Sequence, residues 1–241
     1  MASTFPSRTL PQTSRGWRLT ASVLVLGCLA AFPSAYADTI PDWNLITAQT
    51  LQTAKAGGGL HQSRVYAMVH GAMFDAVNAI DRRYHSYAAD LKMGPGLSQD
   101  AAAAAAAHAV LAALHPQQQE TLDAALAASL ATVQDGPAKA DGVALGKAAA
   151  ETMLALRRND RMSEKASYVP KTGPGAFQLP ANATLLGPHW GAVTPFTLES
   201  IQDFRFPGPP ALTSTRYAQD FNEVKAVGAK NSTLRTAEQT A

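Results

Sequence analysis

Histidine and carboxylate side chains are the first candidates for chemistry in this chain, because histidine ligates metals and transfers protons near neutral pH. Six histidines are present. His61 and His70 are nine residues apart in a predicted helix, and about 100° per residue places them on opposite sides. His108 and His115 can share a face, but no carboxylate beside them completes a ligand set, and Pro116 is expected to end their helix. We therefore predict no metal ligand, no cofactor-binding residue and no catalytic residue.

A polar stripe on the predicted helix 61–82 is the other candidate. Its members recur at helical spacing on a different face from the apolar residues: Arg64, Gly71, Asp75 and Asn78. Arg64 and Asp75 are too far apart along one helix to pair with each other, although each can find a partner elsewhere. The stripe is interpreted as a buried hydrogen-bonded network, with a solvated face as the alternative and direct catalysis as the third reading.

Known catalytic motifs are absent. The sequence contains no Gly-rich phosphate loop, no Gly-x-Ser-x-Gly, no His-Glu-x-x-His and no paired cysteine motif. Two triplets, Asn182-Ala183-Thr184 and Asn231-Ser232-Thr233, fit the glycosylation acceptor pattern, which says nothing about activity.

Helical periodicity dominates the region that must position these residues. In helix 61–82 the apolar residues recur at spacings of three and four and are expected to be buried: Val65, Val69, Ala72, Ala76 and Ile80. Further helices are predicted over 42–54, 99–114, 116–135 and 138–159. Ser98 is the expected cap of the alanine-rich helix, and Leu145, Met153 and Leu156 are expected to point inward from the last one. The prediction is an all-α antiparallel bundle without a sheet.

The composition changes after Asp160. A long Pro/Gly-rich irregular segment, 160–212, carries aromatic residues that we expect to anchor it to the bundle surface: Phe177, Trp190, Phe196, Phe204 and Phe206. A further helix is predicted after Thr213 or Ser214, with an ion pair between Arg216 and Asp220.

The first 37 residues have the layout of a signal peptide. Three arginines precede an apolar run from Leu19 to Ala31, and Ala35-Tyr36-Ala37 supplies small residues for cleavage after Ala37. The run is too short for a membrane span. We predict export to the periplasm or the medium, with a lipoprotein anchored through Cys28 as the weaker alternative.

Charge and cysteine content narrow the function classes. Residues 1–37 hold three of the 20 basic residues and none of the 18 acidic ones, so the mature chain would have 17 basic residues and no clustered positive charge. This composition argues against nucleic-acid binding. Because Cys28 is the only cysteine, the mature chain also has no disulfide or thiolate ligand.

Three stretches together resemble the N-terminal half of the bacterial vanadium-dependent haloperoxidases, relatives of the type 2 phosphatidic acid phosphatases. The first is RVYAMVHGAMFDAVN at 64–78, and the second is GPHWGAVTPF at 187–196. The third comprises Pro209-Pro210, Tyr217, Asn222-Glu223-Val224-Lys225, Ser232 and residues 235–240. The resemblance covers nearly the whole of 38–241 and implies the N-terminal helical half of such a domain.

What the resemblance implies for chemistry lies outside these stretches. The family holds vanadate or phosphate with a lysine, an Arg-Pro, a Ser-Gly-His segment and a further arginine and histidine. Neither Arg-Pro nor Ser-Gly-His occurs here, so no site residue is carried over. We expect a fragment that is inactive and unstable alone, whose complete parent oxidises halide with peroxide or hydrolyses phosphate esters of a small-molecule substrate. A homo-oligomer is compatible with this interpretation. The alternative function is that of a non-catalytic exported helical binding domain.

Overall fold

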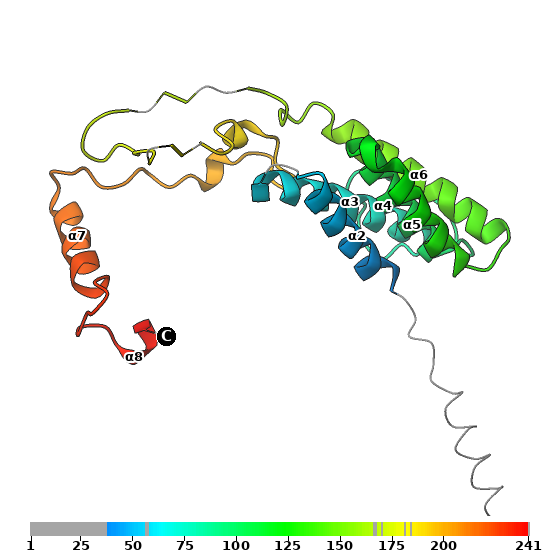
Figure 1. The fold of residues 1–241 in the computed structure, drawn as a ribbon, viewed down its shortest axis with the longest axis horizontal. Coiled ribbons are helices and arrows are strands. Elements are labelled where there is room, and N and C mark those ends of the chain that lie inside the picture. Colours follow the sequence, from blue (N-terminus) through cyan, green and yellow to red (C-terminus); the bar gives the residue numbers. More distant parts are fainter. Residues whose placement is uncertain are drawn as a thin grey trace, which may run out of the picture.

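The structure is a computed structural model that describes residues 38–55, 58–165, 168–169, 171–180, 182–183 and 185–240. The predicted signal peptide, 1–37, lies outside the described residues. Within them the chain forms helices and no strand, which confirms the all-α prediction. Five helices form a bundle (Figure 1): α2 (Thr39–Thr53), α3 (Gly58–Ile80), α4 (Gln99–Leu114), α5 (Gln119–Ala131) and α6 (Pro137–Arg157). A short 3-10 turn, Pro116–Gln118, leads into α5.

Side-chain caps define where several helices begin. Asp38 accepts a hydrogen bond from the backbone N–H of Ile40 at the start of α2. Ser98 accepts one from Ala101 at the start of α4, as the sequence predicts. Each cap satisfies a backbone donor that has no partner within the helix, so the chain enters these helices at defined residues.

The alanine-rich helix α4 is the centre of the bundle. It packs against α2, α3, α5 and α6, and every residue from Ala101 to Ala107 is buried. The apolar face predicted for α3 is buried as well, since Val65, Val69, Ala72 and Ala76 have no exposed surface and Ile80 is 7% exposed. Small side chains on α4 allow its neighbours to approach closely, and α3 supplies the larger ones.

The prediction that Leu156 of α6 points inward is wrong. Leu145 and Met153 are buried, but Leu156 is 53% exposed and the next residue, Arg157, is only 2% exposed. The physical reason is an ion pair, because Arg157 turns inward to meet the buried carboxylate of Asp160. At this end of α6 a charged partner, rather than hydrophobicity, determines which side chain is buried.

Two glycines of α6, Gly142 and Gly146, contact the backbone of the chain at α4 directly. A Cβ atom on Gly146 would overlap with the carbonyl oxygen of Ala102 and lie 2.9 Å from the amide nitrogen of Ala106. A Cβ on Gly142 would lie 2.6 Å from the carbonyl oxygen of Ser98. These neighbours are backbone atoms of another helix, so they can yield only if the helices separate.

We therefore expect Gly146→Ala to destabilise the bundle by about 1–3 kcal/mol, the usual range for overpacking. The sign is the opposite of the usual one, because alanine is favoured over glycine in a helix by up to about 1 kcal/mol. Gly59→Ala in α3 is the matched control, since nothing lies within 4 Å of its added Cβ. Urea unfolding of both variants measures the effect, and a stabilised Gly146→Ala would contradict this packing.

The segment after α6 is anchored to the bundle at a few points only. It contains the 3-10 turns Trp190–Ala192 and Gln202–Phe204, and continues into α7 (Thr215–Val227) and α8 (Ala237–Thr240). Phe196 packs against the core, but Phe177, Phe204 and Phe206 are 55%, 65% and 93% exposed. The prediction that these three aromatic residues anchor the segment is therefore wrong. Figure 1 shows α7 and α8 away from the bundle.

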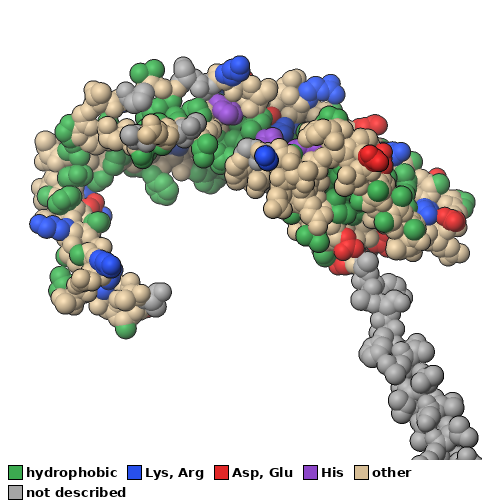
Figure 2. Space-filling model, in the orientation of Figure 1, with side chains coloured by type: hydrophobic (Ala, Val, Ile, Leu, Met, Phe, Trp, Pro, Cys, Tyr) green, Lys and Arg blue, Asp and Glu red, His purple; other side chains and the backbone are tan. Residues whose placement is uncertain are grey.

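Helix α7 begins where the sequence predicts. Ser214 caps it by accepting a hydrogen bond from Tyr217, and Arg216 pairs with Asp220 at 2.9 Å. No residue of α7 is buried. Figure 2 shows hydrophobic side chains at the surface along this part of the molecule.

Candidate functional site

The polar stripe of α3 is a buried network, not a solvated face. Arg64 is 8% exposed, Asp75 is 1% exposed and Asn78 is 5% exposed. Gly71 is the close-contact point of the same stripe, because an added Cβ would lie 2.6 Å from the Cε atom of Met153 on α6. Each of the three polar side chains finds its partners in a different part of the chain.

Arg64 reaches the end of α6. Its Nε donates to the Oδ2 atom of Asp160 at 2.6 Å, and its Nη2 donates to the backbone carbonyl of Arg157 at 3.1 Å. Asp160 is 3% exposed. This contact joins residues 96 positions apart and closes one end of the bundle.

Arg157 links the same carboxylate to the proline-rich segment. Its Nε lies 3.1 Å from Oδ2 of Asp160, its Nη1 donates to the carbonyl of Pro195, and its Nη2 donates to the carbonyl of Thr194 at 2.6 Å. The guanidinium also stacks 3.9 Å above the ring of Phe196. We call Arg64, Arg157 and Asp160 the charged cluster.

The electrostatics of the charged cluster favour an ionised carboxylate. Burial by itself raises the pKa of Asp160. The hydrogen bond from Arg64, the backbone N–H of Met162 and the charges of Arg64 and Arg157 outweigh it, so this pKa lies below its ordinary value. Two guanidinium groups share one carboxylate, so the charged cluster is positive. All three guanidinium nitrogens of Arg157 donate to acceptors of the protein. Those donors are therefore occupied by the protein itself.

Asp75 and Asn78 fix the connection that follows α3. The carboxylate of Asp75 accepts backbone hydrogen bonds from Tyr87, Ala88 and Ala89 at 2.6, 2.7 and 2.9 Å. The side chain of Asn78 accepts from the backbone of Arg83 and Tyr84 and donates to the carbonyl of Tyr84. Both side chains supply hydrogen-bond partners for backbone groups that have none in a regular helix or sheet.

His108 has a partner that the sequence did not reveal. Its Nε2 lies 2.6 Å from Oδ1 of Asp123 on α5. The turn at Pro116 folds α5 back onto α4 and brings Asp123 to His108, a pairing that the sequence analysis did not predict. Among the described residues no group of three or more His, Cys, Asp or Glu side chains is arranged to hold a metal ion.

His115 lies at the junction of α4 and the turn into α5. It is 5% exposed, and its Nε2 atom has no hydrogen-bond partner among the described residues. Burial lowers the pKa of His115 and of His61, and the charge of Arg64 lowers that of His61 further. Both rings are therefore neutral at pH 7.

Comparisons with known proteins add no relative. No protein-family model, no curated protein and no solved structure matches the chain. Within the part that the structure describes, no helix has the length and apolar character needed to cross a membrane.

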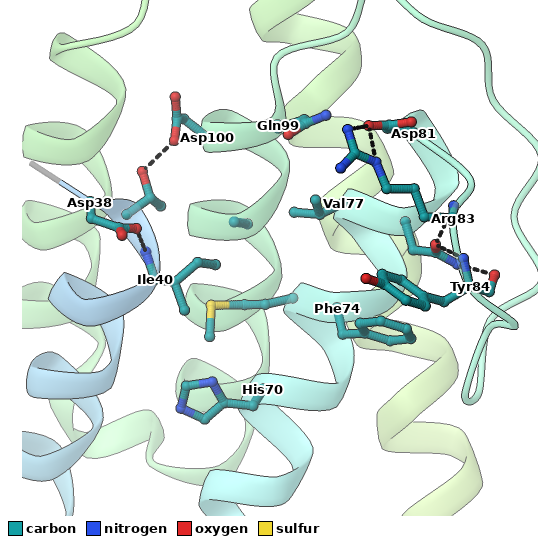
Figure 3. A pocket seen from close by; sticks show the side chains of 14 residues that line it. Asp38, Ile40, His70, Phe74, Val77, Asp81, Arg83, Tyr84, Gln99 and Asp100 are labelled. Carbon is teal, nitrogen blue, oxygen red and sulfur yellow. Dashed lines mark hydrogen bonds and ion pairs between the residues drawn. The ribbon is translucent and has the colours of Figure 1, made fainter. Parts of the chain in front are cut away.

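A groove of about 680 Å³ lies between the start of α2, the C-terminal half of α3 and the start of α4. Its apolar lining is formed by Ile40, Met73, Phe74, Val77 and Tyr84, and its carboxylates are Asp38, Asp81 and Asp100. Figure 3 shows Asp38 and Asp100 on the same side of the groove, with the Phe74 and Tyr84 rings next to each other across from Ile40. We call this the acidic groove.

The sequence did not indicate several features of the site: the roles of Arg157, Asp160 and Asp123, and the acidic groove. The spacing of Arg157 and Asp160 around the end of α6 is a local signal that could have paired them. No local signal marks Arg64 as the third member, and the groove forms from three helix segments that only the fold brings together.

Proposed function

We propose that this chain supplies the N-terminal helical part of an exported vanadium-dependent haloperoxidase-like or type 2 phosphatidic acid phosphatase-like protein. The vanadate- or phosphate-binding residues then lie outside these 241 residues. The complete protein would oxidise halide with peroxide or hydrolyse phosphate esters, and this part would act as its scaffold.

The charged cluster carries this proposal. Two of the stretches that resemble the family, 64–78 and 187–196, are more than 100 residues apart in the sequence. They meet at one end of the bundle, where Asp160 pairs with Arg64 and Arg157 binds the carbonyls of Thr194 and Pro195. A buried ion cluster by itself contributes little to the free energy of folding. It is better suited to hold one segment, here residues 194–195, in a defined position.

Exposed apolar side chains on the C-terminal segment support the scaffold role. They comprise Phe204, Phe206, Leu212, Phe221, Val224 and Leu234, each between 45% and 93% exposed. The third family-like stretch, which begins at Pro209, runs through the same region. In this proposal the oxyanion-binding half of the parent covers these side chains.

Activity assays on the purified chain test the scaffold proposal. We expect no oxidation of bromide with peroxide and vanadate, no release of phosphate from a phosphate monoester, and no saturable ⁵¹V NMR shift of vanadate. The physical reason is that the buried arginines already bind Asp160 and backbone carbonyls. A reaction without protein is the control for background activity, and turnover by the wild-type chain above that control would contradict the proposal.

The acidic groove favours a second candidate function, a non-catalytic exported binding domain. Its volume lies in the range of small-molecule sites, about 300–1,000 Å³. In this alternative the helices from 39 to 157 are sufficient for ligand binding. Saturable binding of a small molecule, combined with no encoded continuation of the family motifs, would favour it over the scaffold proposal.

A further inference from the structure

The acidic groove combines an apolar interior with an edge that carries more carboxylates than cationic side chains. Three carboxylates line the groove. Among the described residues of its lining, Arg83 is the one arginine or lysine. Asp81 already pairs with Arg83 at 2.7 Å. Burial lowers the pKa of His70, so this ring is neutral at pH 7 and does not offset the charge. Because Asp81 is paired with Arg83, Asp38 and Asp100 leave the lining with a formal charge of about −2, counted as three carboxylates against one guanidinium.

Asp38 and Asp100 both have hydrogen-bonding capacity left for a ligand. The Oδ1 atom of Asp38 accepts from the backbone of Ile40, and the Oδ1 atom of Asp100 accepts from the Thr39 hydroxyl at 2.7 Å. A carboxylate has about four acceptor positions. The Thr39 bond also holds the two helix starts together, so both carboxylates are fixed on one side of the groove (Figure 3).

Aromatic and aliphatic side chains form the rest of the lining. The Phe74 and Tyr84 rings lie 6.2 Å apart between centroids and are 39% and 69% exposed. Met73 and Val77 on α3 and Ile40 on α2 complete the apolar surface. Electron-rich ring faces attract cations within about 6 Å, and they also cover the apolar body of a ligand.

We propose that the acidic groove binds an organic cation, with an ammonium or guanidinium head group at Asp38 and Asp100 and an aromatic or branched apolar body against Phe74, Val77 and Ile40. Charge complementarity selects this class, because a carboxylate-bearing ligand would be repelled and a neutral one would leave the two carboxylates without a charged partner. Cleavage after Ala37 would add an α-ammonium at Asp38 and reduce the net charge of the lining to about −1, which still favours a cation.

This inference does not rest on the scaffold proposal, and it names a ligand class for the second candidate function. None of Arg64, Arg157 and Asp160 lines the groove. His70, the lining residue of α3 nearest to Arg64 in the sequence, is six residues away, about 9 Å along the helix axis. The two proposals can therefore fail separately, since one concerns oxyanion chemistry and the other concerns cation binding.

Titration of the full chain with phenethylammonium, followed by ¹H–¹⁵N NMR at low salt, tests the inference. We expect saturable shifts at backbone amides of residues 39–40, 73–77 and 99–103. The neutral analogue 2-phenylethanol and the anion 3-phenylpropionate should bind at least about 10-fold more weakly, a difference of about 1.4 kcal/mol. Phe74→Ala should weaken the binding of both the ammonium and the alcohol.

The double variant Asp38→Asn/Asp100→Asn separates charge from structure. Asparagine also caps helices and retains an acceptor oxygen, so the variant should melt at the wild-type temperature. It should bind phenethylammonium at least about 10-fold more weakly, whereas Glu151→Gln on the exposed face of α6 should bind it normally. Any of four results would overturn the inference. They are unchanged affinity in the double variant, equal affinity for 2-phenylethanol, an absence of saturable shifts, and groove shifts that depend on protein concentration alone.

Discussion

Asp160→Ala is expected to destabilise the chain by about 3–5 kcal/mol, the usual loss when one partner of a buried ion pair is removed. The variant leaves the guanidinium groups of Arg64 and Arg157 buried at 8% and 2% exposure without their carboxylate. It also weakens the attachment of residues 194–196. Urea unfolding measures the free-energy change, with exposed Asp141→Ala on α6 as the control.

The pH dependence of this effect has a definite sign. The pKa of Asp160 lies below the ordinary value of 3.8, so its stabilisation is fully present above pH 3.8 and is lost as the pH falls through the lower folded-state pKa. The difference in unfolding free energy between wild type and Asp160→Ala should therefore be smaller at pH 2.5 than at pH 5. A difference below about 1 kcal/mol at pH 5 would contradict a charged cluster built around this carboxylate.

Asp75→Ala is expected to cost about 3 kcal/mol, because three hydrogen bonds to a buried carboxylate are lost and each contributes about 1 kcal/mol or more. The effect should be local as well as global. Backbone amides of Tyr87, Ala88 and Ala89, which donate to this carboxylate, should lose protection from hydrogen exchange.

Asp81→Ala is the matched control for this experiment. Asp81 lies six residues further along the chain, just after the end of α3. Its carboxylate pairs with Arg83 at the surface and is expected to contribute less than about 1 kcal/mol. Retained protection at Tyr87–Ala89 in Asp75→Ala would show that the connection after α3 is held by other contacts.

The helices were predictable because their signals are local. The cap at Ser98 and the apolar face of α3 each lie within a few residues of the structure they determine. The same reasoning placed Arg64 and Asp75 in a buried network without naming their partners. These predictions needed no knowledge of which helices are neighbours.

The partners were not predictable, because they come from distant parts of the chain. Asp160 is 96 residues from Arg64, and Asp123 reaches His108 only after the chain reverses at Pro116. Leu156 was expected to be buried on hydrophobicity alone, but the pairing of Arg157 with Asp160 decides the orientation there. The aromatic residues 177, 204 and 206 were expected to anchor a loop, yet they are exposed.

In our proposal, residues of the family-like stretch 64–78 also hold the bundle together. Arg64, Asp75 and Asn78 all belong to the first family-like stretch, and each is engaged in fixing a segment outside α3. This coincidence suits a scaffold whose function is to position connections, and in our proposal those connections border the oxyanion pocket of the complete protein.

Reading the coding DNA beyond codon 241 tests the central claim most directly. The account predicts an in-frame continuation that encodes a lysine, an Arg-Pro dipeptide and a Ser-Gly-His segment, followed by a further arginine and histidine. A stop codon directly after Ala241, with none of these motifs encoded downstream, would contradict it.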